Sequence, residues 1–144
     1  MEDIKPVTIL LVEDDPGDQK LTKKFLSEAR IINEAVIAGC GEEGLDYLER
    51  CRGADSEYLR PDLILLDLNM PGMGGKEFLK RVKNDEDFCM IPIVILTTSD
   101  LVQDVRDSYK LQASGYIKKP VTLQGFQEMM ENLQEYWFSI CKLA

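Results

Sequence analysis

The sequence has no histidine among its 144 residues. This absence excludes a histidine-containing metal site and a Ser-His-Asp triad. The four cysteines include no Cys-X-X-Cys pair. We therefore expect reduced thiols, as is usual in a cytoplasmic protein.

Long apolar runs and basic clusters are also missing. The N-terminal segment MEDIKPVTIL lacks the basic region and apolar core of a signal peptide, and no apolar run approaches the roughly 20 residues of a membrane span. The chain carries 17 basic and 26 acidic side chains, a net charge of −9, without a run of lysine or arginine. Because phosphate backbones and anionic lipids repel such a surface, we expect neither nucleic acid nor a membrane as a partner.

Short apolar runs alternate along the chain with segments of helical periodicity. The runs predict strands over residues 7–12, 34–39, 62–67, 91–99 and 114–119. The other segments predict helices over residues 16–30, 42–51, 75–85, 101–112 and 121–144. This alternation predicts an α/β fold, a doubly wound parallel sheet of five strands with five helices on its two faces. No repeat or flexible linker divides the chain, so we expect a single domain over residues 1–144.

Polar side chains follow the predicted strands, at the sheet edge where open α/β folds bind ligands. Glu13, Asp14 and Asp15 follow the first strand, and Asp67 follows the third. Carboxylates brought this close repel one another unless a cation lies between them. A hard cation such as Mg²⁺ takes oxygen ligands of this kind.

A hydroxyl and an ammonium group complete this edge. Thr97 ends the fourth predicted strand, and Lys119 ends the fifth. Both groups stabilise a transferring phosphoryl group, and a carboxylate can act as a covalent nucleophile. The pattern therefore predicts Mg²⁺-dependent phosphoryl transfer onto Asp67.

Four motifs stand at the ends of these strands: ILLVEDD, LILLDLNMPGMGG, VILTTS and GYIKKP. In this order and spacing they resemble the receiver domain of two-component response regulators, over nearly the whole chain. The resemblance implies a flavodoxin-like fold with strand order 2-1-3-4-5. It also implies a phosphoacceptor signalling protein rather than an enzyme, with self-catalysed phosphotransfer and slow autodephosphorylation.

The resemblance implies roles for the acidic residues. Asp67 is the phospho-acceptor and Asp14 a direct metal ligand. Glu13 holds a metal-bound water, and Asn69 binds the metal through its backbone carbonyl. Glutamate at position 13 replaces the aspartate of the simplest receiver pattern, a change that receivers commonly allow. A solvated surface acid is the simpler interpretation of Glu13.

The resemblance also implies roles around the phosphoryl group. Thr97 hydrogen-bonds it, and Lys119 pairs with one of its oxygens. Tyr116 is the aromatic switch that turns inward when Thr97 is drawn to the phosphate, although a half-buried strand tyrosine is the simpler interpretation. The Lys119–Pro120 peptide bond is cis in this family, whereas only about 5–6% of X-Pro bonds are cis in general.

Several neighbouring residues have structural interpretations that we prefer. Asp15 is expected near the N-cap of a helix that begins at Pro16. Thr98 and Ser99 are expected to cap the next helix. Lys118 is expected to be an exposed strand charge rather than a second catalytic lysine.

The chain contains no helix-turn-helix and no basic helix. We therefore expect no output domain, and signalling through the receiver surface or by phosphate relay. Without histidine, the phosphoryl donor must be another molecule. The resemblance implies a sensor histidine kinase or a histidine phosphotransfer protein.

The last predicted helix carries a long apolar stripe of Leu123, Phe126, Met130, Leu133, Trp137 and Ile140. Its first half is expected to pack on the sheet, and its end, EYWFSI, to project as an interface. We predict a homodimer through the fourth helix, fifth strand and fifth helix, with Leu133, Trp137 and Ile140 in the contact. This ending, with EYLRPDLILLDLNMP and VILTTS, resembles single-domain regulators of phytochrome-type kinases.

Three alternatives stay open. A Toprim-like metal enzyme acting on nucleic acid would use a second acid where this chain has Asn69. A flavodoxin-like nucleotide binder would need a glycine-rich loop, where this chain has EDDPGD. A receiver-like docking module that accepts no phosphate would bind its partner equally well after Asp67→Asn.

Overall fold

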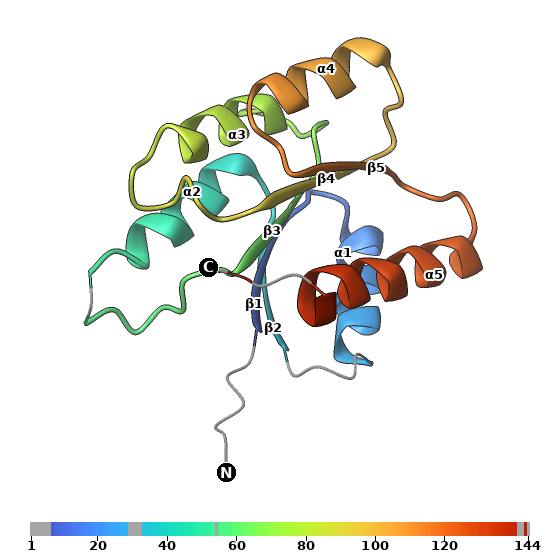
Figure 1. The fold of residues 1–144 in the computed structure, drawn as a ribbon, viewed down its shortest axis with the longest axis horizontal. Coiled ribbons are helices and arrows are strands. Elements are labelled where there is room, and N and C mark those ends of the chain that lie inside the picture. Colours follow the sequence, from blue (N-terminus) through green and yellow to red (C-terminus); the bar gives the residue numbers. More distant parts are fainter. Residues whose placement is uncertain (1–6, 29–32, 54, 141–142, 144) are drawn as a thin grey trace.

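The computed structural model describes residues 7–28, 33–53, 55–140 and 143, with only the backbone of residues 139 and 140 (Figure 1). In this part of the chain, strands and helices alternate as predicted. The strands are β1 (Val7–Val12), β2 (Asn33–Ala38), β3 (Leu63–Leu66), β4 (Ile93–Thr97) and β5 (Gly115–Lys118). The helices are α1 (Pro16–Ser27), α2 (Gly41–Arg50), α3 (Gly75–Lys83), α4 (Val102–Lys110) and α5 (Leu123–Gln134), followed by the π-helix η1 (Glu135–Ile140).

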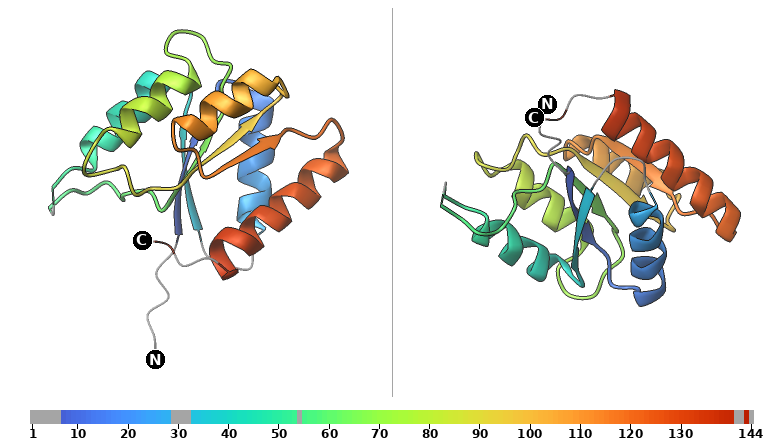
Figure 2. Two further views of the ribbon diagram at one scale, coloured as in Figure 1. Left: turned by 45° about the horizontal axis from the view of Figure 1, so that its top comes forward. Right: turned by 90° about the horizontal axis from the view of Figure 1, so that it is seen from below.

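All neighbouring strands are parallel, in the order β2-β1-β3-β4-β5. This confirms the fold class and the predicted strand order. Helices α1 and α5 cover one face of the sheet, and α2, α3 and α4 cover the other (Figure 2). The chain leaves β1 toward β2 on one side and returns to β3 on the other, so the switch in strand order lies between β1 and β3.

Strand β3 explains why the sequence shows continuous apolar runs rather than alternation. Leu63 and Leu65 pack in the layer with α1 and α5, while Ile64 and Leu66 pack in the opposite layer against Phe78. All four strand residues are fully buried. A strand that is covered on both faces has no solvent side, and so it has no polar alternate positions.

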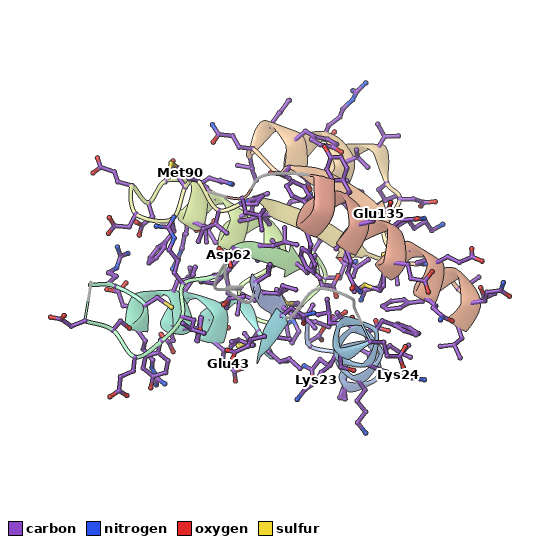
Figure 3. All side chains as sticks on the ribbon, turned by 60° about the horizontal axis from the view of Figure 1, so that its bottom comes forward. Lys23, Lys24, Glu43, Asp62, Met90 and Glu135 are labelled. Carbon is purple, nitrogen blue, oxygen red and sulfur yellow. The ribbon has the colours of Figure 1, made fainter. Side chains whose placement is uncertain are left out.

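Charged and polar side chains occupy the outer surfaces of the helices and loops. Figure 3 shows Lys23 and Lys24 on the outside of α1 and Glu43 on α2. Asp62 lies just before β3 and links it to β1, because its carboxylate accepts a hydrogen bond from the Thr8 backbone N–H at 2.9 Å. Across the described ranges, we find no helix with the length and apolar character that crossing a membrane requires.

The last helix differs from the prediction of one regular helix over residues 121–144. Thr122 caps α5 by accepting a hydrogen bond from the Gly125 N–H at 3.0 Å, and regular α-helix ends at Gln134. The Gln134 side chain turns inward and donates to the Phe25 carbonyl at 3.1 Å. The wider turns of η1 then follow, with Trp137 packed against the core rather than projecting from it.

Candidate functional site

The polar strand ends meet at one edge of the sheet, as the parallel topology requires. The register places Val12 beside Leu66, so the residues that follow β1 and β3 are neighbours. The Asp67 N–H donates to the Val12 carbonyl at 3.0 Å. On the other side, the Lys119 N–H donates to the Thr97 carbonyl at 2.7 Å. The predicted acceptor, hydroxyl and ammonium residues therefore lie on three adjacent strand ends.

Three of the predicted carboxylates form one cluster. Glu13, Asp14 and Asp67 each offer an oxygen atom, and these atoms lie within 4.8 Å of one another. Glu13 and Asp67 are buried, whereas Asp14 is exposed. Two buried oxygen donors beside one open to solvent suit a hard divalent cation that keeps part of its water shell. The cluster therefore fits divalent metal binding.

The charge state of Glu13 reflects this crowding. Burial, followed by the neighbouring Asp67 carboxylate, raises the pKa of Glu13 to about 8 against the opposing effect of the Lys119 ammonium. Glu13 is a member of the site and not the solvated surface acid of the simpler interpretation.

Lys119 is the cation that faces Asp67. Its side chain is only 7% exposed, and its Nζ donates to the Glu13 carboxylate and to Asp18 Oδ2 at 2.7 Å, with Asp67 Oδ2 at 3.7 Å. Burial alone would lower the pKa of Lys119, but the hydrogen bonds to Asp18 and Glu13 raise it above its usual value. The ammonium is therefore charged and held in place, as a group that binds a phosphoryl oxygen must be.

The loop after β3 is shaped by close backbone approach. The Asn69 N–H donates to Asp67 Oδ1 at 3.3 Å and orients the carboxylate. A Cβ atom at Gly75 would overlap the Asp67 carbonyl oxygen and lie 2.7 Å from the Leu68 Cα. Gly72, at φ +74°, has the left-handed conformation that glycine adopts without strain. The glycines after Asp67 thus let α3 begin directly against the acceptor strand.

Thr97 and Tyr116 meet at the loop after β4. Thr97 is fully buried, and its Oγ1 accepts from the Ser99 N–H at 3.5 Å. The Tyr116 hydroxyl donates to the Ser99 carbonyl at 2.9 Å. Both predicted switch residues therefore contact Ser99, in the short loop after β4.

One connection at this loop was missed by sequence reasoning. Ser99 Oγ donates to Asp104 Oδ2 at 2.6 Å, and Asp104 Oδ1 pairs with Lys76 of α3 at 2.6 Å. Ser99 Oγ also accepts from the Leu101 N–H at 3.3 Å, but Leu101 is itself the N-cap of α4 and no side chain among the described residues caps this helix, so the predicted capping role of Thr98 and Ser99 is wrong. Thr98 is exposed, and none of the hydrogen bonds described for this loop involves its side chain. No local pattern marks the pairing of Lys76 with Asp104, because the two lie on different helices.

The structural interpretations of Asp15 and Lys118 are confirmed. Asp15 caps α1 through a 3.1 Å hydrogen bond from the Gly17 N–H, and Pro16 is the first helical residue. Lys118 is 55% exposed and pairs with Asp100 at 3.0 Å. The implied cis bond at Lys119–Pro120 is wrong for this structure, which has no cis peptide bond in the described ranges. Trans is the lower-energy form of an X-Pro bond.

The predicted dimer residues have different surroundings. Leu133 is only 4% exposed and belongs to the chain's own core, so its side chain offers little surface to a partner. Trp137 is half-buried. It lines a shallow groove between β5 and α5 together with Ile117, Met129 and Tyr136. The side chain of Ile140 lies outside the described residues.

The strand-end residues of the candidate site, from Glu13 to Lys119, all lie in a range that matches one protein family. Residues 9–131 match the response regulator receiver domain family. The response regulator Rcp1 of Synechocystis sp. is 36% identical over 138 residues, which cover 96% of this chain and 93% of Rcp1. The predicted receiver family is thereby confirmed.

Solved structures give the same result. The phosphorylated cyanobacterial phytochrome response regulator RcpA superposes with a TM-score of 0.90 at 35% identity, over 96% of this chain and 99% of RcpA. The Mn²⁺-bound form of Rcp1 superposes with a TM-score of 0.89 at 35% identity, over the same shares of the two chains. The chain belongs to the response regulator receiver family of two-component signalling proteins.

Proposed function

We propose that this chain accepts a phosphoryl group on Asp67 in a Mg²⁺-dependent reaction and signals through its receiver surface. One observation carries the proposal: the buried Asp67 carboxylate clusters with the oxygen donors of Glu13 and Asp14, and its Oδ2 is 3.7 Å from the ammonium of Lys119. The nucleophile Asp67 thus lies beside both a cation site and a fixed positive charge. The arrangement matches the needs of phosphoryl transfer.

The transfer balances with a phosphohistidine as donor. An Asp67 carboxylate oxygen attacks the phosphorus, the new O–P bond forms as the N–P bond breaks, and the leaving imidazole keeps the bonding electron pair and takes a proton from solvent. Lys119 and Thr97 stabilise the charge on the phosphoryl oxygens. Asp14, Asp67 and the Asn69 carbonyl would hold Mg²⁺, with Glu13 on a metal-bound water, and the ion would neutralise the remaining charge.

The donor is a sensor histidine kinase or a histidine phosphotransfer protein, since this chain has no histidine. A phytochrome-type kinase is the more specific proposal. It is supported by the similarity to RcpA, which is described as a phytochrome response regulator. We place the reaction in the cytoplasm. The match to 93% of Rcp1 supports a single receiver domain over residues 1–144.

Intact-mass measurement tests the proposal. With Mg²⁺ and acetyl phosphate, the protein is expected to gain one phosphoryl group, roughly 80 Da. Excess EDTA is expected to prevent the gain, because the three carboxylates and the incoming phosphoryl group then repel one another without a cation. If a histidine kinase also transfers nothing, the proposal fails, and a docking module that accepts no phosphate becomes the better interpretation.

The homodimer is proposed through the face of α4, β5 and α5. Tyr136 is 52% exposed beside Trp137, with the two rings 5.3 Å apart, and Tyr109 of α4 is also exposed. Light scattering after size exclusion is expected to show that Tyr136→Lys lowers the dimer fraction of the phosphorylated protein severalfold, since a desolvated charge disfavours an apolar contact. The matched control is Tyr58→Lys, which alters an exposed tyrosine after α2. Equal loss in both variants would argue against this face.

A further inference from the structure

Asp18 lies in the candidate site although no part of the sequence pattern pointed to it. It is in the first turn of α1, which is anchored by the Asp15 cap and by Pro16. Its carboxylate oxygen is 2.7 Å from Lys119 Nζ, and its side chain is 24% exposed. An acid in the first turn of a helix usually interacts with the helix dipole alone. Here it also contacts the lysine that faces the phospho-acceptor.

Three carboxylates share one ammonium group. Glu13 and Asp18 accept hydrogen bonds from Lys119 Nζ, whereas Asp67 Oδ2 is 3.7 Å away, beyond hydrogen-bonding distance. An ammonium has three N–H donors, and each acceptor that holds one limits the approach of the others. The ammonium therefore lies against Glu13 and Asp18 and farther from the residue that would carry the phosphoryl group.

A bound cation would change this competition unequally. Glu13 and Asp67 belong to the carboxylate cluster that fits a divalent metal, and Asp18 does not belong to it. A cation in the cluster would compensate the charge of Asp67 directly and that of Glu13 through a bound water. Asp18 would keep its full negative charge next to Lys119. It would then be the main rival of a phosphoryl oxygen for that ammonium.

Resting on the function proposed above, we infer that Asp18 is a positioning residue that competes with the phosphoryl group for Lys119. Its carboxylate neutralises part of the positive charge of the Lys119 ammonium and places a negative charge near the phosphoryl oxygens. Both effects lower the affinity of the receiver for the phosphoryl group. Asp18 thereby sets how readily the phosphorylated state forms and how readily it is lost.

The test uses beryllofluoride, a non-transferable mimic of the phosphoryl group, at saturating Mg²⁺. Asp18→Asn keeps the size and the acceptor oxygen of the side chain but removes its charge. We expect isothermal titration calorimetry to give a dissociation constant that is roughly three- to tenfold lower in this variant, the range for a partly exposed charge pair. Asp18→Glu restores the charge and is expected to bind within about twofold of the wild type.

The matched control is Asp46→Asn, which removes one exposed carboxylate from α2 and leaves the site unchanged. It is expected to bind beryllofluoride as the wild type does. Equal or weaker binding by Asp18→Asn would overturn the competition and show that Asp18 only holds Lys119 in place. If the wild type neither binds beryllofluoride nor gains mass with acetyl phosphate, the proposed function fails as well. Wild-type binding without a tighter Asp18→Asn variant overturns the inference about Asp18 alone.

Discussion

Asp67→Asn is expected to abolish the Mg²⁺-dependent gain of a phosphoryl group while leaving the protein folded. The amide has no negatively charged oxygen to attack phosphorus, so the covalent step is lost rather than slowed. An asparagine Oδ1 can still accept the 3.3 Å hydrogen bond from the Asn69 N–H, and the site loses one of its crowded negative charges. Intact mass with acetyl phosphate measures the loss, and circular dichroism checks the fold.

The matched control for this change is Asp100→Asn. Asp100 also follows a strand of the sheet, but it is exposed and pairs only with Lys118 among the ion pairs of the described residues. It is expected to take up phosphate as the wild type does. Undiminished uptake by Asp67→Asn would mean that another carboxylate is the acceptor, and Asp14 would then be tested in the same way.

Lys119→Met is expected to slow phosphoryl uptake at Asp67 by about 100-fold, the effect of losing one fixed donor to a developing oxyanion. Methionine fills a similar volume but cannot donate to a phosphoryl oxygen. The initial rate of mass gain with acetyl phosphate measures the effect. We expect the uptake rate to fall while Asp67 stays the acceptor, because Asp67 itself is unchanged.

The neighbouring lysine provides the control for this second change. Lys118→Met alters the preceding residue, which is exposed and faces Asp100 instead of Asp67. Its uptake rate is expected to stay within about twofold of the wild type, as befits an exposed ion pair. Similar slowing in both variants would show that any positive charge near this edge of the sheet speeds phosphoryl uptake equally. The 3.7 Å distance between Lys119 and Asp67 would then have no special role.

Predictions based on periodicity agreed well with the structure. The apolar run of β3, followed directly by Asp67, predicted both a buried strand and a carboxylate at its end. The boundaries were less accurate, since β4 is Ile93–Thr97 within the predicted range 91–99. Apolar character extends beyond the hydrogen-bonded ladder, and only the pairing with neighbouring strands sets where a strand ends.

The predicted final helix shows where periodicity was insufficient. A stripe at three- and four-residue spacing is compatible with one long helix, and it does not reveal which apolar residues a partner could reach. In the structure, Leu133 is buried in the chain's own core, and the α-helix gives way to a π-helix after Gln134. The buried hydrogen bond from Gln134 to the Phe25 carbonyl depends on α1, which is distant in sequence.

The sequence by itself determined the strands, the helices, and the motifs that assign the chain to the receiver family. These features depend on neighbouring residues, through periodicity, turns and strand ends, and so a linear pattern carries them. Only the tertiary structure decided that Asp18 contacts Lys119 and that Lys76 joins Asp104 and Ser99. Such contacts depend on how α1, α3 and α4 pack around the sheet. Charge pairing acts through distance in space, which spacing along the chain does not encode.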